Sequence, residues 1–340
     1  MKALVYTGTR RIEMQNLPEP CLGPQDAIVA VGAVGICGSE LEAYLGMSRK
    51  RVPPLVMGHE FAGTIYALGE SVKGFAIGEK VVVQPLLNCG SCPECISGRT
   101  NICRNRKLLS IELPGGYAEC AAVPASALFR LPSGVPFEIG SLAEPLANAV
   151  HILERAKYRV LGKLVILGGG TIGALVLMLA RAIGIEHIAL VEPNEWRRAK
   201  LASLGSEIAV DPRDANSLRT VVEWSGGGAD VVVDASGAAQ ARKFAVECAA
   251  PNGTVVLVGQ GSPSSDADHR DILTKELNIR GSYAYTNDDF LRAIELLRMR
   301  RVDPEGILRT VPMSDGPNVF ADLASGNAGD IKVVMIPAGR

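Results

Sequence analysis

The 340-residue sequence predicts an α/β protein in which a barrel-like antiparallel β domain is joined to a domain with a doubly wound parallel sheet. Three observations predict this class. Residues 1 to about 145 are rich in Gly, Pro and short alternating apolar runs, which are typical of antiparallel strands joined by long loops. From about residue 163, short apolar strands alternate with helices, and this pattern indicates right-handed βαβ units. The length suits two domains that each bury a core.

The expected elements follow from apolar periodicity. In the first part, strands are expected in MKALVYTGTRRIEM, DAIVAVGAVGI, FAGTIYALGE, EKVVVQP and YAECAAVPA. The second part opens with a strand in KLVILGGG and a helix in TIGALVLMLARAIG that ends at Gly184. A strand in HIALVE and a helix in NEWRRAKLASLG follow, with Asn194 as N-cap and Gly205 as stop. ADVVVDAS, TVVLVGQG and LNIRGSYA continue the strands, with the helix AQARKFAVECA between the first two. After about residue 285 we expect one amphipathic helix, NDDFLRAIELLRMRR, and a final strand, IKVVMIP.

Composition and charge argue against two classes of partner. The chain is 47% hydrophobic and 21% charged, and its formal net charge of −1 gives no positive field for nucleic acid or an anionic membrane. No apolar run approaches the ~18 residues that span a bilayer, and the apolar part of the N-terminus is too short for a signal peptide. A cytoplasmic protein without nucleic-acid or membrane partners is therefore predicted.

A glycine motif predicts a dinucleotide site at the start of the second domain. Gly168, Gly170 and Gly173 form G-x-G-x-x-G directly after a strand and before a helix. The first glycine allows a tight turn, the second lets the backbone approach a pyrophosphate, and the third lets the helix pack close to the strand. The N–H groups of the first helical turn, which contains Thr171 and Ile172, then face the phosphates. The alternative is a Gly-rich turn that binds no nucleotide.

An acidic residue at the end of the next strand favours NAD over NADP. Glu192 lies nineteen residues after Gly173, where a carboxylate would accept hydrogen bonds from the adenosine ribose hydroxyls and repel a 2′-phosphate. Arg197 and Arg198 follow one helical turn later and could reduce this repulsion. Their alternative role is an ordinary solvated helix face.

Four clustered cysteines predict a structural zinc site. Cys89, Cys92, Cys95 and Cys103 give the spacing C-x2-C-x2-C-x7-C, whereas the other four cysteines are scattered, unlike a secreted disulfide framework. Four thiolates close a tetrahedral shell around zinc and leave no position for water, so such a site holds a loop in place and does not catalyse. An iron–sulfur cluster fits the spacing less well, and a set of merely buried cysteines is the remaining alternative.

A second set of metal-binding residue types is spread over three segments. Cys37 lies in GICGSE, His59 and Glu60 lie in MGHEFAG, and Glu144 lies in LAEPLANAVH. Taken singly, the cysteine could be a core residue, the histidine a hydrogen-bonded loop residue and Glu144 a helix N-terminal charge. In this order, together with the glycine motif, the four-cysteine loop, GGYAEC, ELNIRGSY and IKVVMIP, they resemble the zinc-containing medium-chain dehydrogenases/reductases along nearly the whole chain. The similarity is to the sorbitol/polyol, butanediol and threonine dehydrogenase branch in particular.

The resemblance implies a domain order and a site. It implies a GroES-like catalytic domain over residues 1–145, a Rossmann NAD-binding domain over 146–284, and a return segment over 285–340 that completes the catalytic domain. Cys37 and His59 match two zinc ligands, Glu60 matches the adjacent acid that binds the metal or lies behind it, and Glu144 matches the third ligand. Ser39 matches the hydroxyl that hydrogen-bonds the substrate alcohol.

The implied activity is hydride transfer between a secondary alcohol or polyol and NAD, giving the ketone, with one catalytic and one structural zinc per subunit. The open zinc position would polarise the substrate oxygen. An exposed edge strand in NIRGSYAY further predicts a homodimer or a homotetramer. Three alternatives remain: a threonine- or butanediol-type dehydrogenase, a zinc-free quinone or enoyl reductase, and a non-catalytic NAD(H)-responsive binding protein on the same fold.

Two positions depart from the family pattern, and a basic run lies beside the expected site. Glu40 stands where relatives usually have an Asp that orients a zinc histidine, and Glu42 stands where many relatives have a histidine that relays the proton. Glu42 either takes over this relay or points to solvent. The run 49–51, RKR, suggests an anionic or even phosphorylated substrate, or else a solvated loop.

Overall fold

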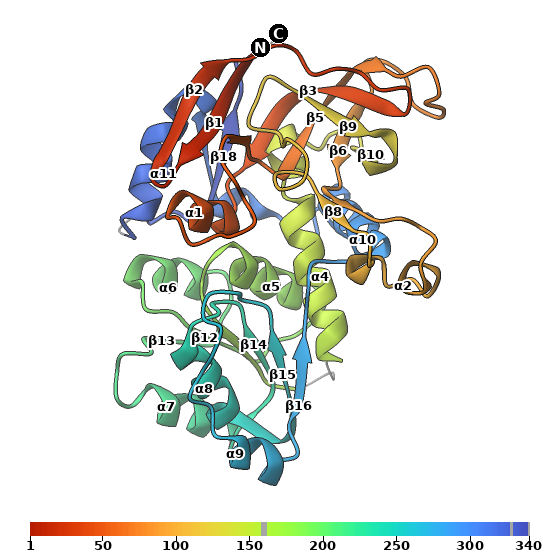
Figure 1. The fold of residues 1–340 in the computed structure, drawn as a ribbon. Helices are drawn as coiled ribbons and strands as arrows, with labels where there is room; N and C mark the ends of the chain where they lie inside the picture. Colours follow the sequence, from red (N-terminus) through yellow and green to blue (C-terminus); the bar gives the residue numbers. More distant parts are fainter. Residues whose placement is uncertain (158–161, 327–328, 339–340) are drawn as a thin grey trace. The chain divides into compact units, whose positions relative to one another are not determined.

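The computed structural model describes residues 1–157, 162–326 and 329–338, which form two compact units (Figure 1). Unit 1 comprises Met1–Glu144, Thr286–Arg300 and Glu305–Arg340. Unit 2 comprises Pro145–Tyr285 and Arg301–Pro304. The chain therefore leaves unit 1 and comes back to it, so that sequence-distant strands meet in one sheet.

Unit 1 is built on a strongly bent, mainly antiparallel sheet whose central strand is β3. The order is β10-β6-β5-β3-β18-β17, with β9 also paired to β3, and a smaller sheet has the order β2-β1-β4. The strands are β1 (Lys2–Gly8), β2 (Arg11–Asn16), β3 (Asp26–Gly35), β4 (Leu55–Val56), β5 (Glu60–Leu68), β6 (Lys80–Val83), β9 (Cys120–Pro124), β10 (Leu128–Arg130), β17 (Leu308–Pro312) and β18 (Lys332–Ile336), with the small pair β7 (Leu86–Leu87) and β8 (Lys107–Leu108). Strand β3 is buried along most of its length and pairs with β5, β9 and β18.

Some of the helices of unit 1 carry or flank predicted site residues. The helices are α1 (Gly38–Tyr44), α2 (Pro93–Ile96), α3 (Phe137–Gly140), the first turn of α4 (Ala143–Ala156), α10 (Asn287–Arg298) and α11 (Gly316–Ala324). Phe320 of α11 packs against Tyr44 and Tyr117 in the core, with ring centroids 5.5 and 6.0 Å away. Aromatic contacts of this kind stabilise the core beyond the area they bury.

Part of unit 1 differs from the elements expected from the sequence. The N-terminal run, expected as one strand, is a hairpin of β1 and β2, because Arg10 takes a positive φ of 56° and turns the chain. Strand β17 and helix α11 were also not expected. Helix α11 has only nine residues and begins with Gly-Pro, so its periodic signal is short.

Unit 2 confirms the predicted parallel sheet. Its strand order is β13-β12-β11-β14-β15-β16 and all pairs are parallel. The strands are β11 (Leu164–Leu167), β12 (Ile188–Val191), β13 (Ile208–Val210), β14 (Ala229–Asp234), β15 (Ala249–Leu257) and β16 (Asn278–Gly281), and the helices are α5 (Thr171–Ala182), α6 (Glu195–Ala202), α7 (Ser217–Ser225), α8 (Ala239–Cys248) and α9 (His269–Thr274). The order reverses between β11 and β14. In open sheets of this type, ligands bind at the carboxyl ends of the strands at such a reversal.

Local signals placed helices α5, α6 and α8 of unit 2, whereas β13 and α9 were not expected. The side chain of Asn194 accepts a hydrogen bond from the Arg197 backbone N–H at 3.0 Å, as expected of an N-cap. Gly184 and Gly205 follow α5 and α6 with positive φ, the usual way to end a helix. Helix α7 was not expected from the sequence, although it too ends at a left-handed glycine, Gly226.

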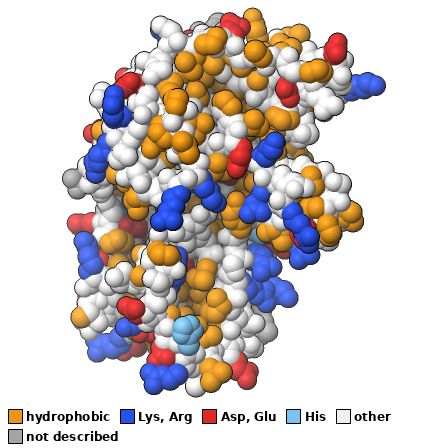
Figure 2. Space-filling view, in the orientation of Figure 1, with side chains coloured by type: hydrophobic (Ala, Val, Ile, Leu, Met, Phe, Trp, Pro, Cys, Tyr) orange, Lys and Arg blue, Asp and Glu red, His pale blue; other side chains and the backbone are white. Residues whose placement is uncertain are grey.

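Acidic and basic side chains are interspersed over the face of the molecule shown in Figure 2, in keeping with the net charge of −1. Within the ranges described above, no helix combines the length and the apolar character needed to cross a bilayer.

Candidate metal and dinucleotide sites

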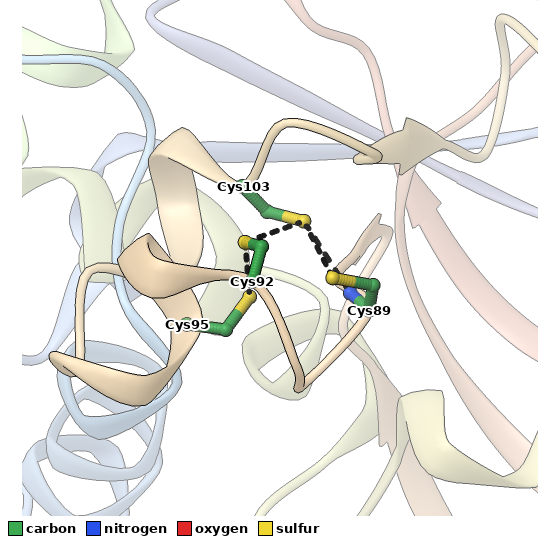
Figure 3. Close-up of side chains that lie close together, drawn as sticks. All are labelled: Cys89, Cys92, Cys95 and Cys103. Atoms are coloured by element: carbon green, nitrogen blue, oxygen red, sulfur yellow. Dashed lines mark hydrogen bonds between the residues drawn. The ribbon is translucent and has the colours of Figure 1, made fainter.

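The four predicted cysteines converge in one lobe of unit 1, the segment from Cys89 to Cys103 between β7 and β8. Cys89 follows β7, Cys92 is the N-cap of α2, Cys95 lies within α2, and Cys103 precedes β8. Their side chains point toward a common centre (Figure 3). The Sγ–Sγ distances are 3.5 Å for Cys89–Cys103, 3.5 Å for Cys92–Cys95 and 3.8 Å for Cys92–Cys103.

These distances fit a tetrahedral zinc ion. With Zn–S bonds of about 2.3 Å, two sulfurs on a tetrahedron lie about 3.8 Å apart. Backbone N–H groups of Cys89 and Asn105 approach Cys103 Sγ at 3.4 Å each, and such donors favour a thiolate. Backbone hydrogen bonds from Ser91 and Cys92 lower the pKa of Cys89 to about 5, whereas burial raises the pKa of Cys95 to about 12. A bound zinc ion would remove this difference in pKa between Cys89 and Cys95, since thiolate ligands are bound deprotonated.

We expect Cys103→Ser to lose one zinc ion per subunit and to lower the melting temperature by roughly 5–10 °C, because a closed site that loses a thiolate no longer holds its loop. Elemental analysis and calorimetry check this. Cys21→Ser is the matched control, since Cys21 is exposed and lies outside the cluster. Unchanged zinc content and melting temperature in Cys103→Ser would contradict a structural zinc at this lobe.

Three residues of the second predicted set also come together. Potential ligand atoms of Cys37, His59 and Glu60 all lie within 4.8 Å of one another. Cys37 is the N-cap of α1 directly after β3, and Glu60 begins β5 opposite Gly35 of β3. Ligands bound at about 2.0–2.3 Å to one zinc ion lie about 3.3–3.8 Å apart, so the donor set fits zinc after side-chain movements of about 1 Å.

Of the remaining predicted residues, Ser39 lies beside the three grouped residues and Glu144 is not part of that group. The Ser39 hydroxyl lies 3.4 Å from Cys37 Sγ. Glu144 is buried in the first turn of α4, but it is not one of the three residues grouped within 4.8 Å, and its role as a ligand stays a prediction. Glu42 is half-buried on α1, and its part in a proton relay also stays a prediction.

A buried lysine that sequence analysis missed lies against Glu60. Lys332 of β18 is 1% exposed, forms an ion pair with Glu60 Oε2 and donates a hydrogen bond to the Ile36 carbonyl at 2.9 Å. Gly35 makes room for this pair, because a Cβ atom there would lie 2.3 Å from Glu60 Oε2 and 2.8 Å from Lys332 Cε. A buried charge needs such a partner. Nothing in IKVVMIP, an otherwise apolar strand, signals this contact.

Glu40 is the centre of a buried hydrogen-bond network behind His59. It is fully buried, and its Oε1 lies 2.7 Å from His59 Nδ1. The carboxylate also accepts hydrogen bonds from Gly58 N (2.7 Å), His59 N (3.2 Å), Ser110 Oγ (3.0 Å), Cys37 N (3.3 Å) and the Tyr117 hydroxyl. A carboxylate on the far nitrogen of a metal-binding histidine fixes the ring orientation. Glu40, despite its extra methylene, therefore lies where a carboxylate would orient His59.

The charges around Glu40 keep it ionised. Burial by itself would raise the pKa of Glu40, but the charges of His59 and Arg51 and the hydrogen bond from Tyr117 outweigh burial and hold that pKa well below its ordinary value. Burial would lower the pKa of His59, yet Glu40 and Cys37 raise it well above its ordinary value. Burial and Glu40 raise the pKa of Tyr117, which stays a donor. Tyr117, Ser110 and Arg51 were not recognised in the sequence as parts of this network.

In unit 2, the glycine motif has the geometry a dinucleotide needs. Gly168 follows β11 with a φ of +100°, which allows the turn. A Cβ atom at Gly173 would lie 1.9 Å from the Gly168 carbonyl oxygen, so only glycine lets α5 begin this close to the strand. Gly170 is the N-cap of α5 and a Cβ there would meet no atom within 4 Å, which leaves its surroundings open. Thr171 and Ile172 form the first turn, whose N–H groups suit a phosphate.

Glu192 lies beside this turn. Val191, the residue before it, pairs with Leu167, the residue before Gly168. The Glu192 carboxylate accepts hydrogen bonds from Gly169 N at 2.5 Å and Asn194 N at 2.7 Å. The guanidinium of Arg198 is engaged with the Glu192 carbonyl at 2.8 Å and with Asp211 at 3.7 Å. Arg198 thus has partners already and is poorly placed to compensate for a 2′-phosphate.

Comparisons with known proteins agree with this arrangement. The family model "Alcohol dehydrogenase GroES-like domain" matches residues 23–133, and "Zinc-binding dehydrogenase" matches residues 171–298. The chain is 39% identical over 308 residues to 2-dehydro-3-deoxy-L-galactonate 5-dehydrogenase of Pseudoalteromonas atlantica, covering 90% of this chain and 89% of the relative. It is 32% identical over 344 residues to sorbitol dehydrogenase of Halalkalibacterium halodurans, covering 99% of both.

A comparison with a solved structure supports the same fold. A Sinorhizobium meliloti protein solved with NADP bound superposes with a TM-score of 0.91 at 31% identity, covering 99% of each chain. The matching family model is a zinc-binding dehydrogenase, and the two relatives are named dehydrogenases. Neither the zinc-free nor the non-catalytic alternative is favoured. The chain belongs to the zinc-dependent medium-chain dehydrogenases/reductases and is an NAD(P)-dependent oxidoreductase of alcohols and polyols.

Proposed function

We propose that this enzyme oxidises a secondary hydroxyl of a polyol that carries an acid group, a sugar acid, to the ketone and uses NAD. The observation that carries the reaction type is the cluster of Cys37, His59 and Glu60 with the Ser39 hydroxyl 3.4 Å from Cys37 Sγ. The substrate class is supported by the relative at 39% identity, whose name describes a sugar acid.

In this proposal the chain's own residues hold the metal and move one proton. Cys37, His59 and Glu60 would bind the catalytic zinc, and a carboxylate has two oxygens, so Glu60 can keep Lys332 on Oε2 and offer the other. Zinc bound there supplies a Lewis acid that makes the substrate hydroxyl easier to ionise, and NAD supplies the hydride acceptor. Ser39 Oγ receives the hydroxyl proton and passes it toward solvent, while Glu40 keeps His59 in orientation.

The test measures the rate at which the purified enzyme forms NADH from NAD with each substrate of a panel, monitored by NADH absorbance. The panel contains hexonates, the matching hexitols, hexitol phosphates, butanediol and threonine. We expect the highest kcat/KM for a sugar acid. A kcat/KM at least ten-fold higher for a hexitol, a hexitol phosphate, threonine or butanediol than for every sugar acid would overturn the proposed substrate class.

We propose NAD as the cofactor because Glu192 would accept hydrogen bonds from the ribose and repel a 2′-phosphate. Each charge-assisted contact contributes about 1.5–3 kcal/mol, and about 1.4 kcal/mol corresponds to a factor of ten. We therefore expect kcat/KM for NAD to exceed that for NADP at least ~100-fold, and Glu192→Ala to narrow this ratio. Equal kcat/KM for both cofactors in the wild type would contradict this role of Glu192.

We also propose a homo-oligomer in the cytoplasm. Strand β16 lies at the end of the sheet of unit 2 and pairs with β15, so its other edge can pair with a second copy. None of the eight cysteines is joined in a disulfide, which suits a reducing compartment. Light scattering at micromolar concentration should give at least twice the subunit mass of 35.9 kDa. Only the single-subunit mass would contradict the oligomer.

A further inference from the structure

We propose that Arg49 and Lys50 form a binding site for an anionic group of the substrate, on a loop that the buried Arg51 fixes to the end of α1 near Ser39. The proposal rests on the proposed function and adds the residues that would recognise the acid. The ligand chemistry is a carboxylate at the end of the substrate opposite the reacting hydroxyl. A phosphate shares this chemistry, and the experiment below separates the two.

Arg51 ties the loop to the candidate catalytic residues. It is 6% exposed, and its guanidinium donates hydrogen bonds to the Ser39 carbonyl at 3.1 Å and to the Ser110 carbonyl at 3.1 Å. Ser110 in turn donates to Glu40. The solvated-loop alternative therefore does not hold for Arg51. An arginine with its planar set of donors fixed in this way holds the backbone on either side of it.

A local turn adds to this rigidity. The Ser48 hydroxyl accepts hydrogen bonds from the backbone N–H groups of Lys50 and Arg51, each at 3.4 Å. These bonds close a turn around Arg49 and Lys50, and Arg51 anchors this turn to the Ser39 and Ser110 carbonyl groups. Preorganisation of this kind reduces the entropy lost when a ligand binds.

The side chains of Arg49 and Lys50 are available to bind an anion. Both are exposed, and in the ranges that the structure describes neither side chain has a hydrogen bond or an ion pair with another residue. Other exposed arginines of unit 1 are paired, such as Arg104 with Glu94 at 2.9 Å. Two adjacent cations without acidic partners are a favourable place for an anion.

The spacing suits a substrate of sugar size. Arg51 reaches the Ser39 carbonyl with its guanidinium, about 7 Å from its own Cα atom, and the Cα atom of Arg49 lies at most about 7 Å further along the chain. Long basic side chains can reach several ångströms back from there. A six-carbon acid oxidised near one end places its carboxylate about 5 Å or more from the reacting carbon, within this range by bond-length arithmetic.

The experiment compares the double variant Arg49→Ala/Lys50→Ala with the wild type on a hexonate, the hexitol of the same carbon chain and its phosphate. We expect KM for the hexonate to rise at least ~10-fold with kcat within ~2-fold, and both constants for the hexitol to stay within ~2-fold. In the charge-preserving variant Arg49→Lys/Lys50→Arg, KM for the hexonate should stay close to the wild-type value. Lys73→Ala, which removes an exposed lysine elsewhere in unit 1, is the matched control.

The outcomes are distinct. If the double variant has a raised KM for the phosphate alone, the anion site holds and is assigned to phosphate. If the double variant loses the same activity on the hexonate and the hexitol, the proposal is overturned. An unchanged KM for both anions also overturns it. If the wild type oxidises no substrate of the panel, the proposed function fails. The anion site is then tested by calorimetric titration of hexonate and inorganic phosphate into the wild type and the double variant, and equal affinities would overturn it.

Discussion

Replacement of Cys37 by Ala is expected to lower kcat at least ~1000-fold and to remove one zinc ion per subunit while leaving the other in place. The physical reason is that Cys37 is the only thiol of the cluster with His59 and Glu60, and a metal that ionises the substrate hydroxyl contributes several kcal/mol to the rate. Steady-state kinetics and elemental analysis of the same preparation measure both effects.

Cys120→Ala is a suitable control for the first prediction, because Cys120 is buried in unit 1 but belongs to neither metal cluster. It should keep both zinc ions and most of the activity. Two zinc ions retained by Cys37→Ala, with kcat within ten-fold of the wild type, would remove Cys37 from the metal site.

Replacement of Glu40 by Ala is expected to damage both stability and activity. It would leave several buried donors, among them Gly58 N, Ser110 Oγ and the Tyr117 hydroxyl, without their acceptor. Each such loss costs about 1–3 kcal/mol, so the free energy of unfolding should fall by about 3–5 kcal/mol. Loss of the carboxylate on His59 should also weaken zinc binding or activity by ~10- to 100-fold. Denaturant unfolding and a zinc competition titration measure the two effects.

Glu40→Asp separates the charge from the reach of the side chain. Asp keeps the charge but is one methylene shorter, so it cannot reach all the partners of Glu40 at once, and we expect an intermediate loss. Glu40→Gln keeps the shape and loses the charge that faces His59 and Arg51. A Glu40→Ala variant with wild-type stability and zinc affinity would show that the network only fills space.

The parts of this account that could be predicted from sequence are local ones. G-x-G-x-x-G fixes a turn over six residues, and four cysteines within fifteen residues can reach one ion without help from the rest of the chain. The cap at Asn194 is local in the same way. For Cys37, His59 and Glu60, single residues carried little information, and only their order along a family-like sequence indicated a shared site.

The contacts that were missed are long-range. Lys332 meets Glu60 across 272 positions of sequence because β18 returns to pair with β3 next to the site. Arg51 is one of three consecutive basic residues, yet it alone is buried, since its guanidinium finds the carbonyl groups of Ser39 and Ser110. No periodicity or motif in the sequence encodes which of three neighbouring basic side chains turns inward.

The most direct test of the central claim is metal removal and restoration on the wild-type enzyme with a sugar acid and NAD. Treatment with a chelator under conditions that remove only the accessible zinc should leave about one zinc ion per subunit and no measurable NADH formation. Adding back one equivalent of zinc should restore activity in proportion to the zinc bound. Full NADH formation by enzyme shown to hold only one zinc ion per subunit, or activity that does not return when the second zinc ion is bound, would contradict a catalytic zinc at Cys37, His59 and Glu60.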